Sequence, residues 1–242
     1  MQAGQPTVGP LFLESNLITV FTCCTDRRDA LRSDQNTDGA HFRAYVDTPV
    51  EKDRCWSHMP ASTLFASARR NARMHKILSH QFTDTEYSIW LDANVALRVP
   101  ARRLVDEYLG DADLAVFRHR TRACTYDEAA RCRELALDAT DVIDAQVGQY
   151  RAAGLPAGLG LPETSVVIRR HSAAVRRFND AWWSELCRHS VRDQIGFMYA
   201  ARDTGLTVNL FTPTKFEHPY FSMTVRPAGA EQAAHALSLI HI

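Results

Sequence analysis

Short apolar runs recur along this chain, and helical patterns fill the segments between them. Most of the runs are continuously apolar rather than alternating, which is typical of strands that are covered on both faces of a sheet. Strands that alternate with helices predict an α/β domain with a Rossmann-like, mostly parallel sheet sandwiched between helices. The expected strands are residues 17–22, 42–46, 87–91, 114–117, 164–168 and 206–211.

Start and stop signals support the expected helices. Pro100 stands just before one of them, and Gly154 and Gly205 follow two others, as is common at helix ends. The Gly/Pro-rich segment 154–162 is short, and the chain has no repeat and no low-complexity linker, so we expect a single domain over residues 1–236. The expected helices are residues 61–78, 101–109, 126–153, 172–187 and 190–204.

The last six residues, LSLIHI at positions 237–242, are treated separately. They correspond to the in-frame translation of a nucleotide sequence that resembles a transposase adapter from sequencing libraries. We therefore expect this tail to be non-native and exclude it from the fold prediction. The alternative is a genuine amphipathic tail.

Charge and composition limit the class of partner. Lys plus Arg and Asp plus Glu each number 28, so the net charge is zero, which argues against a nucleic-acid partner. No apolar run approaches the roughly 18 residues that cross a bilayer, and the start lacks the regions of a secretory signal. The six cysteines form no C-x-x-C pair and are expected to be reduced. The sequence predicts a cytoplasmic protein without a transmembrane segment, which is compatible with peripheral membrane association.

The residues after the first expected strand exclude several nucleotide-binding classes. Positions 23–28 contain no glycine, so the G-x-G-x-x-G turn of NAD enzymes is absent and a SAM-dependent methyltransferase is disfavoured as well. The chain also lacks G-x-x-x-x-G-K-[ST] and G-x-S-x-G, which excludes a P-loop NTPase and the simplest serine hydrolases.

The expected strand 87–91 ends in Asp92-Ala93-Asn94. Residues i and i+2 of an extended chain point to the same side, so Asp92 and Asn94 present two oxygen-bearing side chains together. This edge is where open α/β sheets bind ligands. Mg²⁺ or Mn²⁺ prefers such oxygen ligands and often bridges them to a diphosphate. An Asx turn that caps the strand is the alternative explanation.

A basic segment without acidic residues precedes this strand. No Asp or Glu occurs between Cys55 and Thr83, and the spacing of Arg69, Arg73 and Lys76 places them on one helix face. Such a helix beside an acidic strand tip favours an anionic ligand that is bridged by a metal ion. A solvated basic face is the alternative. The placement of charge, more than its total, therefore points to a nucleotide diphosphate.

Several motifs now stand in a recognisable order. They are R-R-x-x-R-x-x-K, S-I-W-L-D-A-N, H-R, Y-x-E-A, G-L-x-E, W-W and S-x-R-D-Q. Over residues 17–221 this order resembles the glycosyltransferase-like family that includes the plant turgor-regulation-defect and mucilage-related proteins. The resemblance implies a GT-A-type nucleotide-sugar transferase with a D-x-D-like element.

The resemblance also implies a metal site. Asp92 and Asn94 would hold Mn²⁺ or Mg²⁺ on the nucleotide diphosphate, and Arg69, Arg73, Lys76 and Arg192 would bind the donor. Many GT-A enzymes have a second carboxylate where this chain has Asn94. Some take a ligand from a C-terminal histidine, so His218 is the candidate for a third metal ligand.

The S-x-R-D-Q motif carries the candidate catalytic residues. By the same resemblance, Asp193 would bind sugar hydroxyls and Gln194 would lie near the anomeric centre of a retaining enzyme. In an inverting enzyme Asp193 would be the base that deprotonates the acceptor hydroxyl. Ser190 as N-cap with Asp193 at N3 is a structural explanation that is compatible with either role.

Other polar residues complete the candidate site. Glu163, on the loop before strand 164–168, would orient a sugar hydroxyl, and His119 and Glu128 would line an acceptor cleft. One of the adjacent Trp182 and Trp183 is expected in the core, because neighbours on a helix diverge by about 100°.

The sequence thus predicts a glycosyltransferase that moves a hexose or pentose from a nucleotide sugar, UDP-linked, to a glycan, lipid-linked or other hydroxyl acceptor, in polysaccharide biosynthesis. The alternative from another class is a non-catalytic nucleotide-sugar- or glycan-binding protein on the same scaffold, with Asn94 marking a decayed metal site. A nucleotidyltransferase is disfavoured, because that class usually carries a Gly-rich loop after its first strand.

Overall fold

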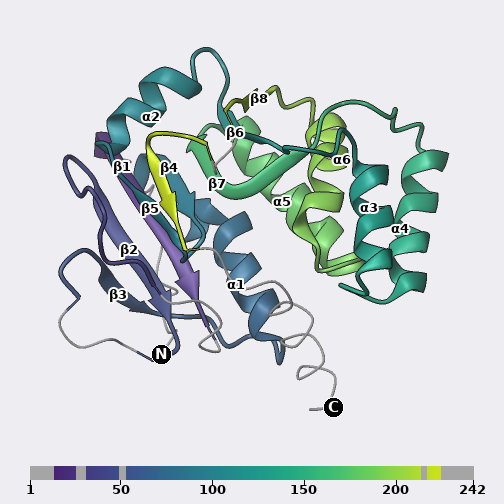
Figure 1. Ribbon diagram of the computed structural model, residues 1–242, viewed down its shortest axis with the longest axis horizontal. Coiled ribbons are helices and arrows are strands. Elements are labelled where there is room, and N and C mark those ends of the chain that lie inside the picture. Colours follow the sequence, from purple (N-terminus) through teal and green to yellow (C-terminus); the bar gives the residue numbers. More distant parts are fainter. Residues whose placement is uncertain (1–13, 26–30, 49–52, 214–216, 225–242) are drawn as a thin grey trace, which may run out of the picture.

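A seven-stranded sheet forms the centre of the computed structural model, which describes residues 14–25, 31–48, 53–213 and 217–224 (Figure 1). Its strands are ordered β3-β2-β1-β4-β7-β6-β8. The tail at 237–242 lies outside the described residues. The strands of this sheet are β1 (Glu14–Cys24), β2 (His41–Val46), β3 (Ser57–Pro60), β4 (Thr85–Leu91), β6 (Leu114–Arg118), β7 (Pro162–Arg170) and β8 (Val208–Phe211).

All six expected strands are present, and three short ones were missed. Strands β1, β2, β3 and β4 pair in parallel, as do β6 and β8, whereas β7 runs antiparallel between β4 and β6. The missed strands are β3, β5 (Val95–Leu97) and β9 (Phe221–Met223), the last two forming a separate antiparallel ribbon. The prediction of an α/β domain with a mostly parallel sheet is confirmed.

The helices follow the expected order, but the first and the last begin later than expected and one expected helix is divided into two. They are α1 (Ala68–Ile77), the short 3₁₀ helix η1 (Ser79–Gln81), α2 (Ala101–Tyr108), α3 (Thr125–Glu134), α4 (Thr140–Ala152), α5 (Ala173–Arg188) and α6 (Asp193–Thr204). Helix α1 begins at Ala68 rather than at 61, because the Ser67 side chain caps it by accepting from the Arg70 N–H. The single helix expected over 126–153 is two helices, with Ala136 at φ 48° in the break.

The start of α6 differs from the expected capping box. Arg192 is the N-cap residue, and Asp193 is the first helical residue instead of the third. Ser190 is drawn into another turn, because its hydroxyl donates to Asp138 at 2.7 Å and accepts from the Arg192 N–H at 3.2 Å. The carboxylate of Asp193 therefore lies at the positive end of the helix dipole and does not form the expected capping box with Ser190.

Both faces of the sheet are covered. Helix α2 and the β5–β9 ribbon pack on one face, and α1, α5 and α6 pack on the other, where Trp182 is fully buried. Helices α3 and α4 pack beside α6 around a third apolar cluster (Figure 1). No helix within the described residues is long and apolar enough to span a bilayer.

The close approach of α5 and α6 predicts a strong effect of Gly196→Ala. A Cβ at Gly196 would lie 3.0 Å from Glu185 Cβ and 3.3 Å from the Tyr150 hydroxyl. We expect a loss of about 1–3 kcal/mol in the free energy of unfolding, because overpacking outweighs the gain in helix propensity. Gly148→Ala in α4 is the control, since no atom lies within 4 Å of the position that its Cβ would take, and it should stabilise the protein by up to about 1 kcal/mol. Urea unfolding measures both; equal shifts would contradict the packing argument.

Candidate active site

A buried carboxylate lies at the start of α6. Asp193 is almost completely buried, and its Oδ2 accepts from Lys76 Nζ at 2.7 Å and from the Thr164 hydroxyl at 2.9 Å. Arg73 Nε lies 3.2 Å from its Oδ1. Residues from α1, β7 and α6 therefore meet at one acidic side chain.

Lys76 connects this carboxylate to the tip of β4. Its side chain is 1% exposed, and its Nζ lies 2.8 Å from Thr164 Oγ1 and 3.8 Å from Asp92 Oδ1. The ammonium also lies 5.8 Å from the centre of the Trp90 ring, within reach of a cation–π interaction. The prediction that the basic helix lies beside the acidic strand tip is confirmed for Lys76, whereas Arg73 contacts Asp193 and Arg69 lies one turn earlier on the same helix.

The charges in this cluster control one another. Burial alone would raise the pKa of Asp193, but Arg73 and Lys76 outweigh it and hold the pKa well below its usual value. Burial lowers the pKa of Lys76, and the attraction of Asp193 and Asp92 offsets part of that effect. Because the charged forms are paired and hydrogen-bonded, the burial of both groups is tolerated.

The tip of β4 holds Asp92 and Asn94 in defined positions. Trp90 Nε1 donates to Asp92 Oδ1 at 2.8 Å, and the Asp92 N–H donates to the Ser165 carbonyl at 2.8 Å. Asn94 Nδ2 donates to the Thr224 carbonyl at 3.1 Å. Within the described residues no backbone N–H donates to the Asp92 carboxylate, so the alternative of an Asx turn is not what orients this side chain.

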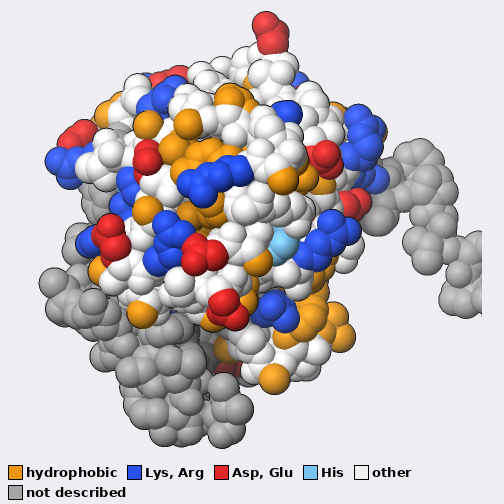
Figure 2. All heavy atoms as spheres, turned by 90° about the vertical axis from the view of Figure 1, so that its right-hand side faces the viewer, with side chains coloured by type: hydrophobic (Ala, Val, Ile, Leu, Met, Phe, Trp, Pro, Cys, Tyr) orange, Lys and Arg blue, Asp and Glu red, His pale blue; other side chains and the backbone are white. Residues whose placement is uncertain are grey.

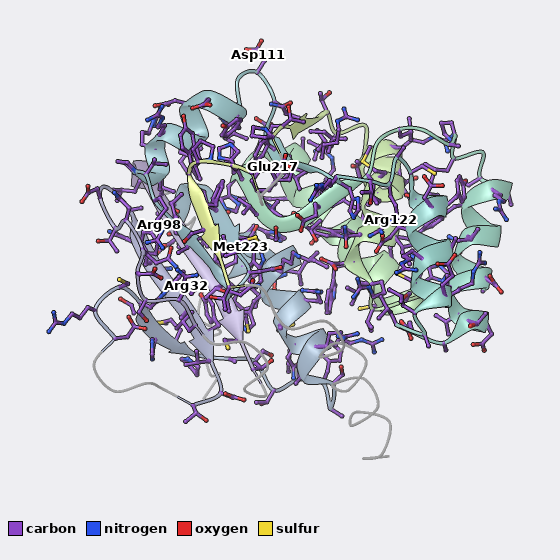
Figure 3. The ribbon with its side chains drawn as sticks, viewed as in Figure 1. Arg32, Arg98, Asp111, Arg122, Glu217 and Met223 are labelled. Carbon is purple, nitrogen blue, oxygen red and sulfur yellow. The ribbon has the colours of Figure 1, made fainter. Side chains whose placement is uncertain are left out.

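The ribbon β5–β9 supports the backbone on both sides of Asn94. The Arg32 N–H donates to the Ala93 carbonyl at 3.0 Å, and the Thr224 N–H donates to the Asn94 carbonyl at 3.1 Å. The side chains of Arg32 and Arg98 lie beside this ribbon and share Asp34 as ion-pair partner, each at 2.6 Å (Figure 3). The strand tip is thus held from the side of the sheet and from the side of the ribbon.

A family comparison identifies what kind of domain carries this arrangement. The model of the TOD1/MUCI70, glycosyltransferase-like domain matches residues 56–224. The chain belongs to the TOD1/MUCI70 glycosyltransferase-like family. The matched region begins one residue before β3 and ends at Thr224, so it contains the strand tip, Lys76 and Asp193.

Two named relatives agree with this membership. The chain is 30% identical over 162 residues to "Probable hexosyltransferase MUCI70" of Arabidopsis thaliana, which covers 61% of this chain and 28% of that protein. It is 26% identical over 171 residues to "Alkaline ceramidase TOD1" of the same plant, which covers 65% of this chain and 37% of that protein. The chain therefore spans well under half the length of these curated relatives.

The fold comparison supports the GT-A-like assignment. A glycosyltransferase involved in the glycosylation of the major capsid of PBCV-1 superposes with a TM-score of 0.50 at 12% identity. The match covers 92% of this chain and 99% of that one. At this identity the likeness concerns the fold, and it confirms the expected GT-A-like scaffold for this glycosyltransferase-like domain.

The TOD1/MUCI70 domain places His218 in an aromatic cluster. His218 is buried against the rings of Phe117, Phe211 and Phe221. Its Nδ1 accepts from the Tyr220 N–H at 3.2 Å, and its Nε2 lies 2.7 Å from the Tyr108 hydroxyl. Both ring nitrogens are engaged by these groups, so the structure does not present a free ring nitrogen of His218 to a metal ion.

The oxygen atoms at the strand tip fit a hard divalent cation in part. Asn94 donates from its amide nitrogen to Thr224, so its Oδ1 accepts no hydrogen bond from the described residues. Asp92 Oδ2 likewise accepts none from them, because Trp90 donates to the other oxygen. No group of three or more His, Cys, Asp and Glu in the described part of the chain could hold a metal ion. Two oxygen ligands therefore suit a cation whose other ligands come from a diphosphate.

Arg122 joins the two candidate acceptor residues. It donates from Nε to Glu128 Oε2 at 2.6 Å, and its Nη2 lies 2.8 Å from His119 Nε2 (Figure 3). Glu128 is 1% exposed and has Arg192 Nη2 at 3.7 Å from its other oxygen. The sequence did not single out Arg122, and Glu128 anchors the two arginines here instead of lining an open surface.

The remaining candidates lie where β7 and α6 begin. Gln194 Nε2 donates to the Pro162 carbonyl at 2.9 Å, which ties the two starts together. Glu163 lies inside β7, paired with Phe117, and not on the preceding loop as expected, because the strand begins two residues earlier than its apolar run. Glu163 at the start of β7 and Gln194 at the start of α6 are thus the chain neighbours of Thr164 and Asp193.

Sequence reasoning missed Thr164 and Trp90 as members of the cluster, and it did not foresee the contact of Trp182 with Asp193. Thr164 lies between Lys76 and Asp193, Trp90 orients Asp92, and Trp182 Nε1 donates to the Asp193 carbonyl at 2.7 Å. The i, i+2 rule that paired Asp92 with Asn94 also points to Trp90, so that residue had a usable signal. The full burial of Trp182 confirms the expectation that one of the two adjacent tryptophans lies in the core. The ring centres of Trp183 and Phe65 are 5.7 Å apart.

Proposed function

We propose that this domain transfers a sugar from a nucleotide-sugar donor to a hydroxyl acceptor. The observation that carries the proposal is the junction at the carboxyl end of β4, where Lys76 lies within 4 Å of both Asp92 and Asp193. In open α/β sheets this edge is the usual place for a ligand. The name of the hexosyltransferase relative supports a hexose as the group transferred.

The tip of β4 is the proposed site for the diphosphate. Asp92 and Asn94 would hold Mn²⁺ or Mg²⁺, and a cation there would neutralise charge on the departing nucleoside diphosphate. Arg73 is partly exposed and is the arginine of α1 that contacts Asp193, so it is placed to reach an anion beside the cluster. Lys76 is too deeply buried to serve mainly as a phosphate ligand, and we assign it the orientation of the two carboxylates.

Asp193 is the proposed acceptor of hydrogen bonds from the donor sugar. A carboxylate whose pKa is held low is a weak base, so it is better suited to accept hydrogen bonds from hydroxyl groups than to remove a proton from one. Gln194 and Glu163 lie at the same level and would contact the same sugar or the acceptor. UDP is the proposed nucleotide, and a glycan, lipid-linked or other hydroxyl compound the proposed acceptor.

Asp92→Ala tests the donor site directly. Isothermal calorimetry with UDP and Mn²⁺ should detect binding by the wild type and a loss of at least about tenfold in affinity for the variant, because the carboxylate ligand is removed. Asp111→Ala is the matched control, since Asp111 projects into solvent at the far end of the molecule and should bind UDP as the wild type does (Figure 3).

Two results would overturn parts of the proposal. Equal binding of UDP and Mn²⁺ by wild type and Asp92→Ala would remove the metal-site assignment. A panel of UDP- and GDP-sugars should yield hydrolysis or transfer with the wild type. Donor binding without turnover of any sugar would instead favour the non-catalytic binding protein, in which Asn94 marks a decayed metal site.

A further inference from the structure

Hydrophobic side chains are exposed on the segment from the end of β3 to the first turn of α1. We call residues 59–70 the rim segment. Leu64 is 76% exposed and Met59 is 39% exposed, and Leu159, at 40%, is the third large hydrophobic side chain that is exposed within the described residues. Two of the three therefore fall within six residues of one another. Isolated exposed hydrophobics are common, whereas such clustering beside a functional edge is informative.

Hydrogen bonds hold the rim segment in shape. The Phe65 N–H donates to Asn71 Oδ1 at 2.9 Å, and Asn71 Nδ2 returns a bond to the Phe65 carbonyl at 2.7 Å. The Ser62 N–H donates to the buried ring of His75 at 3.0 Å. Leu64 lies between these two anchor points, so its exposure is a property of an ordered loop and not of a loose one.

The charge of the rim segment is entirely basic. Neither it nor the rest of the segment between Cys55 and Thr83 contains Asp or Glu. Arg69 and Arg70 lie in the first turn of α1, which has no acidic residue, and cations there oppose the helix dipole. The Arg70 guanidinium lies 5.8 Å from the centre of the ring of Phe65, the residue that follows Leu64. The local charge is therefore complementary to an anionic surface.

The rim segment adjoins the proposed donor site. Thr25, which follows β1, donates to the Ala68 carbonyl at 3.1 Å, so the start of α1 lies at the carboxyl edge of the sheet. Arg73, one turn further along α1, contacts Asp193. Figure 2 shows hydrophobic side chains with a basic one beside them at the lower end of the face that it draws.

We propose that the rim segment docks on an anionic lipid surface, with Leu64 in the interface and Arg70 among the headgroups. A protein partner would need about 800 Å² of matched surface per side, whereas a single protruding side chain backed by arginines suits a membrane. One leucine and a few cations give weak, reversible binding that depends on anionic lipid and on salt. Such docking would bring the sheet edge to a membrane-borne hydroxyl acceptor; only this last consequence rests on the proposed function.

Vesicle sedimentation tests the docking. The wild type should bind phosphatidylcholine vesicles that contain about 30% phosphatidylserine and not vesicles of phosphatidylcholine alone, and added salt should weaken the binding. Leu64→Ser and Arg70→Gln should each lower the bound fraction, with a drop of about fivefold or more in the partition coefficient. Leu159→Ser is the matched control, because it removes a hydrophobic side chain of comparable character from another loop, and it should bind as the wild type does.

Further readouts separate this proposal from the others. Leu64→Ser should keep wild-type circular dichroism and UDP binding, so a failure of docking and a failure of the donor site are distinguishable. Absence of binding to anionic vesicles, or an equal loss in Leu159→Ser, would overturn the proposal. A concentration-dependent dimer in ultracentrifugation that Leu64→Ser abolishes would also overturn it, and would assign the rim segment to self-association.

Discussion

Asp193→Asn should cost about 3–5 kcal/mol of the free energy of unfolding, because it leaves the buried ammonium of Lys76 without its main counter-charge. The replacement keeps the shape of the side chain and removes only the charge, so the loss reports on electrostatics. Sugar transfer should fall by at least about a hundredfold, since the variant weakens hydrogen bonds to the donor sugar. Denaturant unfolding and a donor-turnover assay measure the two effects independently.

The pH dependence of stability gives the same prediction a second readout. The pKa of Asp193 is lower in the folded protein than in the unfolded chain, where an aspartate titrates near about 3.9. Its contribution to stability is therefore fully present above that unfolded value and is lost as the pH falls toward the lower folded pKa. The acid side of the stability curve should be shallower in Asp193→Asn than in the wild type.

A matched acid on the surface provides the control for Asp193. Asp106→Asn removes a carboxylate on the exposed face of α2, where Asp106 Oδ1 lies 2.8 Å from Arg102 Nη2. Such exposed pairs stabilise a protein by at most about 1 kcal/mol. If both asparagine variants lost the same small amount of stability, Asp193 would not be the counter-charge of Lys76 that the geometry indicates.

Lys76→Met should lower the free energy of unfolding by about 3 kcal/mol and reduce turnover by at least about a hundredfold. The variant keeps the length of the side chain but removes the ammonium that spaces Thr164, Asp92 and Asp193. Lysine occurs only at positions 52, 76 and 215 in this arginine-rich chain, so a lysine at the buried position is notable. A compact ammonium fits among three oxygens where a planar guanidinium would not.

Two further variants separate charge from shape at Lys76. Lys76→Arg keeps the charge but should still destabilise the protein, because the larger group does not fit the buried site. The double variant Lys76→Met with Asp193→Asn should lose less stability than the sum of the two single variants, because the two charges that pair most closely are removed together, while turnover stays low. Additive losses in this double-mutant cycle would contradict a direct pairing of the two side chains.

The sequence was sufficient for the layers of the fold but not for its short or interrupted elements. Continuous apolar runs marked the six predicted strands, and all of these but the edge strand β8 are mostly buried. Strand β3 reads Ser-His-Met-Pro, an edge strand with little apolar signal, and β5 and β9 are three residues each. The break between α3 and α4 has no glycine or proline to announce it. Its Asp138 instead accepts hydrogen bonds from Ser190 and Val191, which are remote in sequence.

The candidate site was predictable in its charged members and not in its connections. Strand-end position pointed to Asp92 and the charge pattern to Lys76, whereas the family resemblance of the S-x-R-D-Q motif pointed to Asp193. Thr164 carries no such signal, since a threonine in an apolar strand is ordinary, and only the position of β7 beside β4 gives it two charged neighbours. His218 was a candidate metal ligand by resemblance to GT-A enzymes with a C-terminal histidine, and nothing in the sequence indicated that it packs among aromatic rings.

The antiparallel insertion of β7 next to β4 affects the order in which parts of the domain fold. Lys76 is 88 residues from Thr164, and Asp193 follows later still, so the ammonium lacks its two nearest partners until most of the domain has been synthesised. Long-range pairings of this kind form late in folding, because the closure of a large loop must come first. A ribosome-bound chain that ends in α4 would still expose the Lys76 ammonium to water. The candidate site at the carboxyl end of β4 would therefore be completed late.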